Sequence, residues 1–168
     1  MPPLRIVFDT NVLLSLWVFD KSPGGSTLAP LRAMIESGAL LALSRADCLA
    51  EFERVLGYPE FKLVPEMQQR IFSEYRSVLT MPADAGVNVD VVAVATDVPL
   101  PKCSDRDDQK FLELARDATA QILVTRDKAL LKLARRRQLA GLFRILTPDR
   151  LLEELLSEPA GELSSALP

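Results

Sequence analysis

The segment Leu4-Arg5-Ile6-Val7-Phe8-Asp9-Thr10-Asn11-Val12-Leu13 begins as an apolar run and carries an aspartate where that run stops. The run has the length and composition of a buried strand, which we expect at residues 4–8. A helical pattern follows at once, over residues 11–19. A strand that passes directly into a helix is typical of an α/β fold with a parallel sheet.

The rest of the chain repeats this alternation of short strands and longer helical patterns. We expect further strands at 39–43, 89–95, 121–124 and 143–146, and helices at 26–37, 46–56, 65–79, 105–118, 128–137 and 148–156. The order predicts a three-layer α/β/α sandwich around a central, mostly parallel sheet of about five strands. Residues 1–157 would form one domain, and the polar residues 158–168 would form a flexible tail.

The composition is that of a globular protein without a membrane segment. Of the 168 residues, 48% are hydrophobic and 26% are charged. No apolar stretch approaches the roughly 20 residues that a bilayer crossing needs. The first residues lack the features of a signal peptide, and Cys48 and Cys103 have no spacing that suggests a bridge. We therefore expect a cytoplasmic protein with reduced thiols.

The absence of histidine narrows the chemistry. A chain with no histidine and two cysteines has no Ser-His-Asp triad, no Cys-His pair and no ordinary zinc site. An enzyme built from it must use carboxylates, lysine, hydroxyl groups or a bound cofactor. The net charge of −3 does not by itself indicate nucleic-acid binding, which would need local basic patches or metals.

Three aspartates fall where a parallel sheet binds its ligands, outside the carboxyl ends of the strands. Asp9 directly follows the strand at 4–8, and Asp127 lies three residues beyond the strand at 121–124. Asp108 lies in the first turn of a later helix. Each of them alone is better explained as a helix cap. Together, at one sheet edge, they favour a functional site.

Such an acidic edge needs a positive partner, because neighbouring carboxylates raise one another's pKa unless a cation compensates. Mg²⁺ and Mn²⁺ prefer oxygen ligands, so we expect one or two of these ions. An enzyme that binds such ions can hydrolyse phosphodiesters without a histidine, because the ions activate the attacking water. The acids and the missing histidine thus indicate the same chemistry, metal-assisted phosphoryl transfer.

Three motifs in order resemble those of the PIN domain family. They are the opening segment Ile6-Val7-Phe8-Asp9-Thr10-Asn11-Val12-Leu13, the stretch Cys103-Ser104-Asp105-Arg106-Asp107-Asp108-Gln109-Lys110-Phe111-Leu112-Glu113-Leu114-Ala115, and Ile122-Leu123-Val124-Thr125-Arg126-Asp127-Lys128-Ala129-Leu130-Leu131. With a helical acid at Glu51, the similarity covers about residues 4–150. The resemblance implies a metal-dependent endoribonuclease, often the toxin of a toxin–antitoxin pair with an antitoxin protein as partner, and often a homodimer.

Position by position, the resemblance implies that Asp9, Asp108 and Asp127 bind metal. Asp105 and Asp107 compete with Asp108, whose spacing from the following helix matches the family better. Asp105 remains either a further acid of the site or a helix cap.

The fourth acid is less clearly fixed, because helical periodicity leaves both Glu51 and Glu53 on the flanks of an apolar stripe. Motif position favours Glu51, and a solvated surface glutamate is the alternative. Some PIN proteins carry another acid at the position of Ala129, so the second metal here would bind weakly or only with substrate.

Substrate contacts are expected from residues beside these acids, namely Thr10, Asn11, Arg106, Thr125, Arg126 and Lys128. The polar residues among them could instead cap helices. The run from Arg135 to Arg137 either complements the dipole at a helix end or binds RNA, and the sequence leaves both readings open.

Our hypothesis from the sequence is that the protein is an Mg²⁺- or Mn²⁺-dependent endoribonuclease. Its catalytic acids would be Asp9, Glu51, Asp108 and Asp127. The alternative is a catalytically silent PIN-like module that binds RNA or protein, which the alanine at 129 and the acidic charge keep open. A phosphatase or dehalogenase ranks low, because that chemistry wants an aspartate where Asn11 stands.

Overall fold

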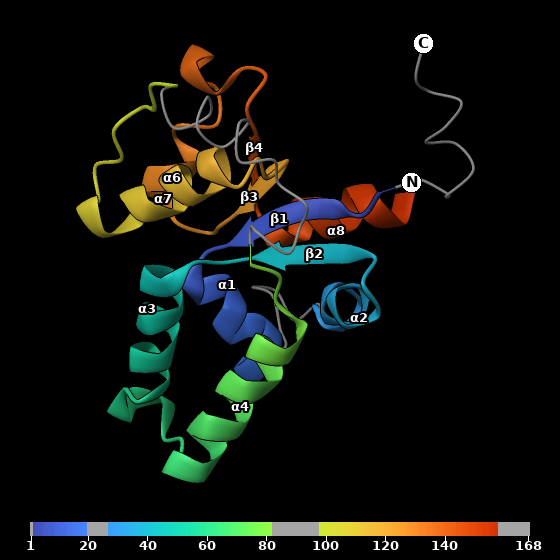
Figure 1. The fold of residues 1–168 in the computed structure, drawn as a ribbon, viewed down its shortest axis with the longest axis vertical. Coiled ribbons are helices and arrows are strands. Elements are labelled where there is room, and N and C mark those ends of the chain that lie inside the picture. Colours follow the sequence, from blue (N-terminus) through green and yellow to red (C-terminus); the bar gives the residue numbers. More distant parts are fainter. Residues whose placement is uncertain (1, 20–26, 82–97, 158–168) are drawn as a thin grey trace.

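The fold is seen in a computed structural model that describes residues 2–19, 27–81 and 98–157 (Figure 1). The strands are β1 (Leu4–Phe8), β2 (Leu40–Leu43), β3 (Ile122–Val124) and β4 (Arg144–Leu146). The α-helices are α1 (Thr10–Leu14), α2 (Ala29–Ser37), α3 (Ala46–Leu56), α4 (Pro65–Val78), α6 (Gln109–Asp117), α7 (Lys128–Leu131) and α8 (Pro148–Ser157). Short turns of other helix types are η1 (Ser15–Phe19), η2 (Pro59–Phe61), η3 (Arg106–Asp108) and η4 (Arg137–Leu139).

The sheet is parallel throughout the described residues, in the order β2-β1-β3-β4. The first strand of the chain therefore lies inside the sheet, and its residues Ile6 to Phe8 are apolar and buried, as is typical of an interior parallel strand. A fifth strand expected at 89–95 lies outside the described residues. Beyond β2, Thr80 forms a single parallel bridge to Leu43. The predicted parallel α/β architecture is confirmed, with four strands among the described residues in place of about five.

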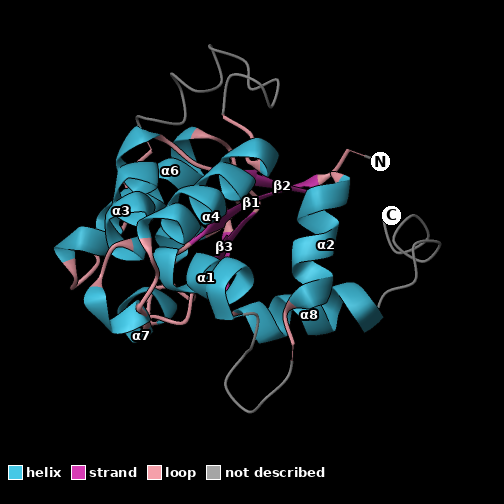
Figure 2. Cartoon of the chain, turned by 90° about the horizontal axis from the view of Figure 1, so that it is seen from below, coloured by secondary structure: helices cyan, strands magenta, loops and turns pink. Residues whose placement is uncertain are grey.

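Side chains on the two faces of the sheet enter two separate hydrophobic cores. Ile6 and Phe8 of β1 join a core with α1, α2, α3, α4 and α8, whereas Val7 joins a core with α6 and α7. This alternation follows from the two-residue period of a strand. Helices thus cover both faces of the sheet (Figure 2), and the expected three-layer sandwich is confirmed.

The helix predicted over 128–137 is shorter than expected, and this prediction was wrong. Helix α7 ends at Leu131, and the three arginines at 135–137 lie beyond it. The apolar stripe explains the difference: Leu130 and Leu133 are buried, but the next position of the stripe is the exposed Arg137. A longer helix would have no apolar face to bury against the core. The helix therefore stops early, and the arginines do not lie at a helix end.

Three other predicted helices differ from the expected α-helix in their type or in where they begin. The first changes into the π-helical turn η1, where the Ser15 hydroxyl donates to the carbonyl of Asn11, 3.3 Å away. The helix expected over 105–118 starts as the 3-10 turn η3 before α6. The helix expected from residue 26 starts at Ala29, and residue 26 itself lies outside the described residues.

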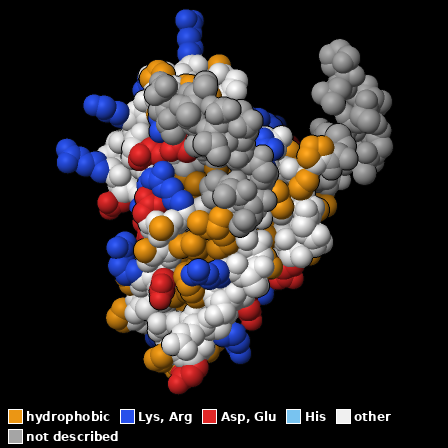
Figure 3. Space-filling view, viewed as in Figure 1, with side chains coloured by type: hydrophobic (Ala, Val, Ile, Leu, Met, Phe, Trp, Pro, Cys, Tyr) orange, Lys and Arg blue, Asp and Glu red, His pale blue; other side chains and the backbone are white. Residues whose placement is uncertain are grey.

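Charged residues of both signs are interspersed on the face shown in Figure 3. None of the helices in the described part of the chain combines the length and apolar character that a bilayer crossing requires.

Candidate metal centre

The centre lies at the carboxyl edge of the sheet, where β1 and β3 end side by side. The backbone N–H of Asp9 donates to the carbonyl of Val124 at 2.9 Å, so the residue after β1 stays attached to the last residue of β3. Thr125 and Asp127 follow β3 immediately. The parallel register of the two strands therefore brings two motifs together that are far apart in the sequence.

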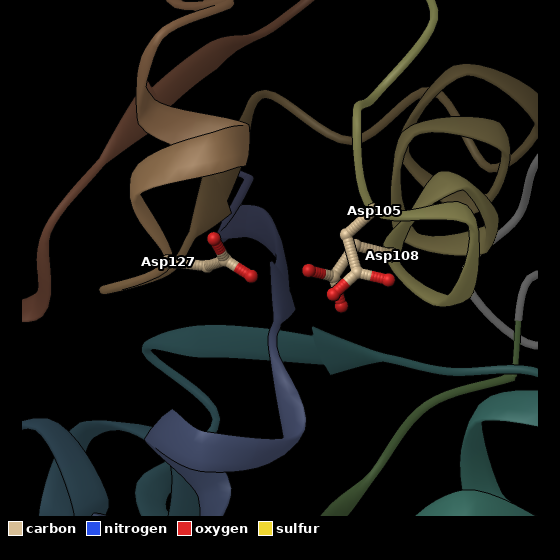
Figure 4. Close-up of side chains that lie close together, drawn as sticks. All are labelled: Asp105, Asp108 and Asp127. Carbon is tan, nitrogen blue, oxygen red and sulfur yellow. The ribbon is translucent and has the colours of Figure 1, made fainter.

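Asp105, Asp108 and Asp127 form a compact acidic cluster. One carboxylate oxygen from each lies within 4.8 Å of the others. Figure 4 shows the carboxylate of Asp127 projecting from the start of α7 toward the other two, which come from the segment before α6. Of the three acids of the third motif that competed in the sequence, the cluster contains Asp105 and Asp108 but not Asp107.

Helix capping is the alternative role for these acids. It explains some of the contacts of Asp127 and Asp105. Asp127 accepts a hydrogen bond from the N–H of Ala129 at 2.7 Å, and Asp105 accepts one from Asp107 at 3.0 Å. Each capping bond uses one carboxylate oxygen, Oδ1, and leaves Oδ2 outside the cap. Asp9 and Asp108 make no capping bond with their side chains. Capping therefore does not account for the side chains of Asp9 and Asp108.

Asp9 lies beside the cluster and is held by β3. The residue is 3% exposed, and its Oδ2 accepts a hydrogen bond from the hydroxyl of Thr125 at 2.7 Å. The same hydroxyl accepts from the N–H of Asp127 at 2.9 Å. Thr125 is fully buried, so its hydroxyl connects two acids of the site and is not open to a substrate.

Glu51 faces the centre and Glu53 does not. One carboxylate oxygen of Glu51 accepts a hydrogen bond from Thr10, and the other accepts one from Lys110 Nζ at 2.8 Å. Its negative charge acts on Asp9. Glu53 is exposed and lines cavities together with Phe72 on the side of α4.

The pKa shifts of the acids show how strongly they interact. Burial raises the pKa of Asp108 to about 8, and its hydrogen bond to Asp127 and the charges of Asp9 and Asp105 add to the rise. Accepting that hydrogen bond lowers the pKa of Asp127. Burial also raises the pKa of Asp9, although the Thr125 hydroxyl opposes the rise. Asp108 thus holds a proton that a cation would replace.

The donor set fits a hard divalent ion. Oδ2 of Asp108 is buried and has no hydrogen-bond partner among the described residues, and a buried carboxylate oxygen normally has one. All three members of the cluster offer carboxylate oxygens, the ligands that Mg²⁺ and Mn²⁺ prefer. Asp105, Asp108 and Asp127 could therefore hold such an ion, with Asp9 and Glu51 beside them.

The other residues expected to contact substrate differ in accessibility. Asn11, Arg106 and Lys128 are exposed around the centre. Arg126 is partly buried, and its Nη1 donates to the hydroxyl of Ser15 at 2.5 Å. Its Nε and Nη2 are buried and have no hydrogen-bond partner within residues 2–19, 27–81 and 98–157. Burial lowers the pKa of this guanidinium, and the charge of Asp149 partly offsets the effect.

Two residues of the centre were missed by the sequence analysis. Lys110 pairs with Glu51, and its place two residues after Asp108 in the third motif was the signal that could have found it. Ser15 holds Arg126, and only the folded chain brings these two together.

Comparison with known families agrees with this geometry. The model of the PIN domain family matches residues 5–129, which include β1, β3 and all the acids of the centre. The chain therefore belongs to the PIN domain family, whose members are generally nucleases. No curated protein and no solved structure matches the chain.

Proposed function

We propose that this protein is an Mg²⁺- or Mn²⁺-dependent endoribonuclease. One observation carries the proposal: carboxylate oxygens of Asp105, Asp108 and Asp127 converge within 4.8 Å, and a buried oxygen of Asp108 has no hydrogen-bond partner in the described part of the chain. Family membership supports nuclease chemistry in general. RNA is proposed as the substrate because the motifs resemble a branch of the PIN family, and that resemblance implies an endoribonuclease.

The residues of the chain take different parts in this proposal. Asp108 and Asp127 would hold the ion with Asp105, while Asp9 and Glu51 complete the negative site. Thr125 is a positioning residue for Asp9, and Thr10 is one for Glu51. Arg106 and Lys128 are exposed beside the acids and would contact phosphate groups, as would Asn11.

When bound, the metal lowers the pKa of a water molecule and stabilises charge on the leaving oxygen. With water as the nucleophile in place of the ribose 2′-hydroxyl, the products carry 5′-phosphate and 3′-hydroxyl ends. A single ion is the simplest arrangement, because Ala129 stands where some PIN proteins carry a further acid.

The test is incubation of the purified protein with mixed RNA in Mn²⁺ or in EDTA. We expect cleavage only in Mn²⁺, and its loss in Asp9→Asn and Asp108→Asn. Glu53→Gln serves as the control, because Glu53 is exposed away from the centre. If cleavage persists in both aspartate variants, the proposed site is wrong.

A second candidate is a silent PIN-like module that binds RNA or protein. The ion pair between Lys110 and Glu51 favours it, because a cation of the chain already neutralises one acid. This candidate predicts no cleavage in Mn²⁺ and unchanged RNA binding in Asp9→Asn. Cleavage by the wild type excludes it.

We also propose a homodimer that acts in the cytoplasm, with an antitoxin protein as a further partner. Exposed hydrophobic side chains support a protein interface: Phe19 is 48% exposed and Val64 is 52% exposed. The thiols of Cys48 and Cys103 are free, as expected in a reducing compartment. Co-purification of a protein encoded beside this chain would test the antitoxin.

A further inference from the structure

A pocket of about 680 Å³ lies along β4, the strand at the edge of the described sheet. Four arginines line it: Arg135, Arg136, Arg137 and Arg144. Its remaining lining is mostly apolar and includes Ile145. The pocket extends along the whole strand, because all three residues of β4 contribute to it.

The charge of this pocket is unbalanced. None of the residues lining it is acidic, and Arg135, Arg136 and Arg137 are exposed and form no ion pair with any described residue. Arg144 is the exception, since it pairs with Glu154 at 2.9 Å. Three neighbouring cations repel one another, so an anion would be favourable there. The planar guanidinium group matches phosphate oxygens in particular.

The pocket adjoins the acidic centre. The carbonyl of Leu146, at one end of the pocket, accepts a hydrogen bond from the N–H of Thr125 at 2.9 Å. The hydroxyl of Thr125 in turn holds Asp9 at 2.7 Å. One residue therefore separates the pocket wall from the proposed catalytic acids.

The distance from the centre to the arginines suits a strand of RNA. After α7 ends at Leu131, the chain continues in short hydrogen-bonded turns, and the N–H of Arg136 donates to the carbonyl of Leu133 at 2.9 Å. At about 1.5 to 2.0 Å per residue, Arg135 lies about 12 to 16 Å beyond Asp127. A stacked strand rises about 3.4 Å per nucleotide, so about four nucleotides span this distance.

We infer that the arginine-lined pocket binds the phosphates of an RNA strand about four nucleotides away from the bond that is cleaved. The inference rests on the proposed function, and it assigns to this protein a preference for RNA that extends well past the cleavage point. An acidic protein segment would also match the arginines, but it would gain nothing from the adjoining metal centre. A phosphate chain would bind at both places at once, which strengthens its binding.

The test compares two triple variants that lose the same charge. R135Q/R136Q/R137Q removes the pocket arginines, and R54Q/K62Q/R76Q removes three exposed cations near α3 and α4. Binding of a labelled RNA of about 20 nucleotides is measured by anisotropy in EDTA at several salt concentrations. We expect the pocket variant to bind about tenfold more weakly, with the slope of log K against log salt reduced by about 2 for three lost contacts. The control variant should bind like the wild type.

Cleavage in Mn²⁺ supplies a second measurement. The pocket variant should cleave a four-nucleotide RNA as fast as the wild type does and a long RNA more slowly. Equal losses in the two triple variants, or an equal loss on short and long RNA, would overturn the inference. So would displacement of the RNA by polyglutamate as readily as by unlabelled RNA, which would assign the pocket to an acidic protein segment. If the wild type cleaves nothing, the proposed function fails, while the anisotropy still decides the pocket.

Discussion

Asp108 is the acid whose charge depends most on its neighbours. Its carboxyl group is partly buried, shares a hydrogen bond with Asp127 and lies within the field of Asp9. All three effects favour the protonated form. The folded, metal-free protein therefore keeps a proton at Asp108 that the unfolded chain, with a pKa near 3.8, has already released at neutral pH.

This difference gives the first prediction, which concerns how the free energy of unfolding depends on pH in EDTA. The folded pKa is about 8, above the unfolded value, so the stabilisation is present at low pH and is lost as the pH rises toward 8. Between about pH 6 and about pH 8 we expect the wild type to lose about 1 kcal/mol, after allowing for solvent screening. Asp108→Asn, which is always neutral, should lose less. Urea unfolding at each pH measures this, and parallel curves for the two proteins would contradict it.

Thr125 offers the second prediction, because its buried hydroxyl connects Asp9 with the backbone of Asp127. Thr125→Val keeps the shape of the side chain and removes both hydrogen bonds. We expect metal affinity to fall about 10- to 100-fold, as is typical for groups that orient metal ligands. A Mn²⁺ titration of cleavage measures it. Thr125→Ser restores the hydroxyl and should recover most of the affinity, and a serine variant as poor as the valine variant would argue for a packing role.

Helix α3 carries the third prediction, at the scale of the element. It presents Glu51 to the centre and Glu53 to solvent, on one helix and two residues apart. Glu51→Gln should slow cleavage about 100-fold, since it removes a charge beside the metal. Glu53→Gln should change the rate less than about twofold, because it alters only an exposed side chain. Single-turnover rates on one RNA measure both, and equal effects would remove Glu51 from the site.

The same helix shows how far the sequence determines the site. Periodicity predicts β1, and the PIN motifs predict acids at the ends of β1 and β3 and before α6, because those features are local or follow strand ends. The structure groups Asp108 and Asp127 and places Asp9 beside them, while their role as metal ligands stays a prediction. Periodicity leaves Glu51 and Glu53 equivalent. Their difference arises from Lys110 on α6, a contact between elements far apart in the chain.

The arginines after α7 illustrate a second limit. The sequence places them at the end of a helix, but the buried stripe ends at Leu133, and the chain turns to bury Leu139. Tertiary packing therefore overrides local helix propensity here.

At the scale of the whole molecule, the metal should stabilise the fold. An ion that binds only the folded chain adds about 2.7 kcal/mol when its concentration is 100 times its dissociation constant. We expect Mn²⁺ to raise the melting temperature of the wild type by several degrees. Asp108→Asn should show little increase, and calorimetry with and without EDTA measures both. A rise of equal size in the variant would place the bound ion elsewhere.

The proposed homodimer gives the last prediction. Near the end of the α3–α4 pair, the exposed rings of Phe19 and Tyr58 pack on the half-buried Phe61. The ring centroids are 5.5 Å apart for Phe19 and Phe61, and 6.4 Å apart for Tyr58 and Phe61. If these residues form the interface, Val64→Glu should yield monomers, because it buries an unpaired charge. Sedimentation velocity measures the assembly state. A variant that stays dimeric would exclude this surface as the interface.

The acidic cluster draws one member from the start of α7 and two from the segment before α6. An ion seated among them would act as a cross-link between two stretches of backbone that share no strand pairing. Chelation should then release both stretches together. Faster amide hydrogen exchange in η3 and at the start of α7, with the interior of β1 unchanged, would be the local signature of that release.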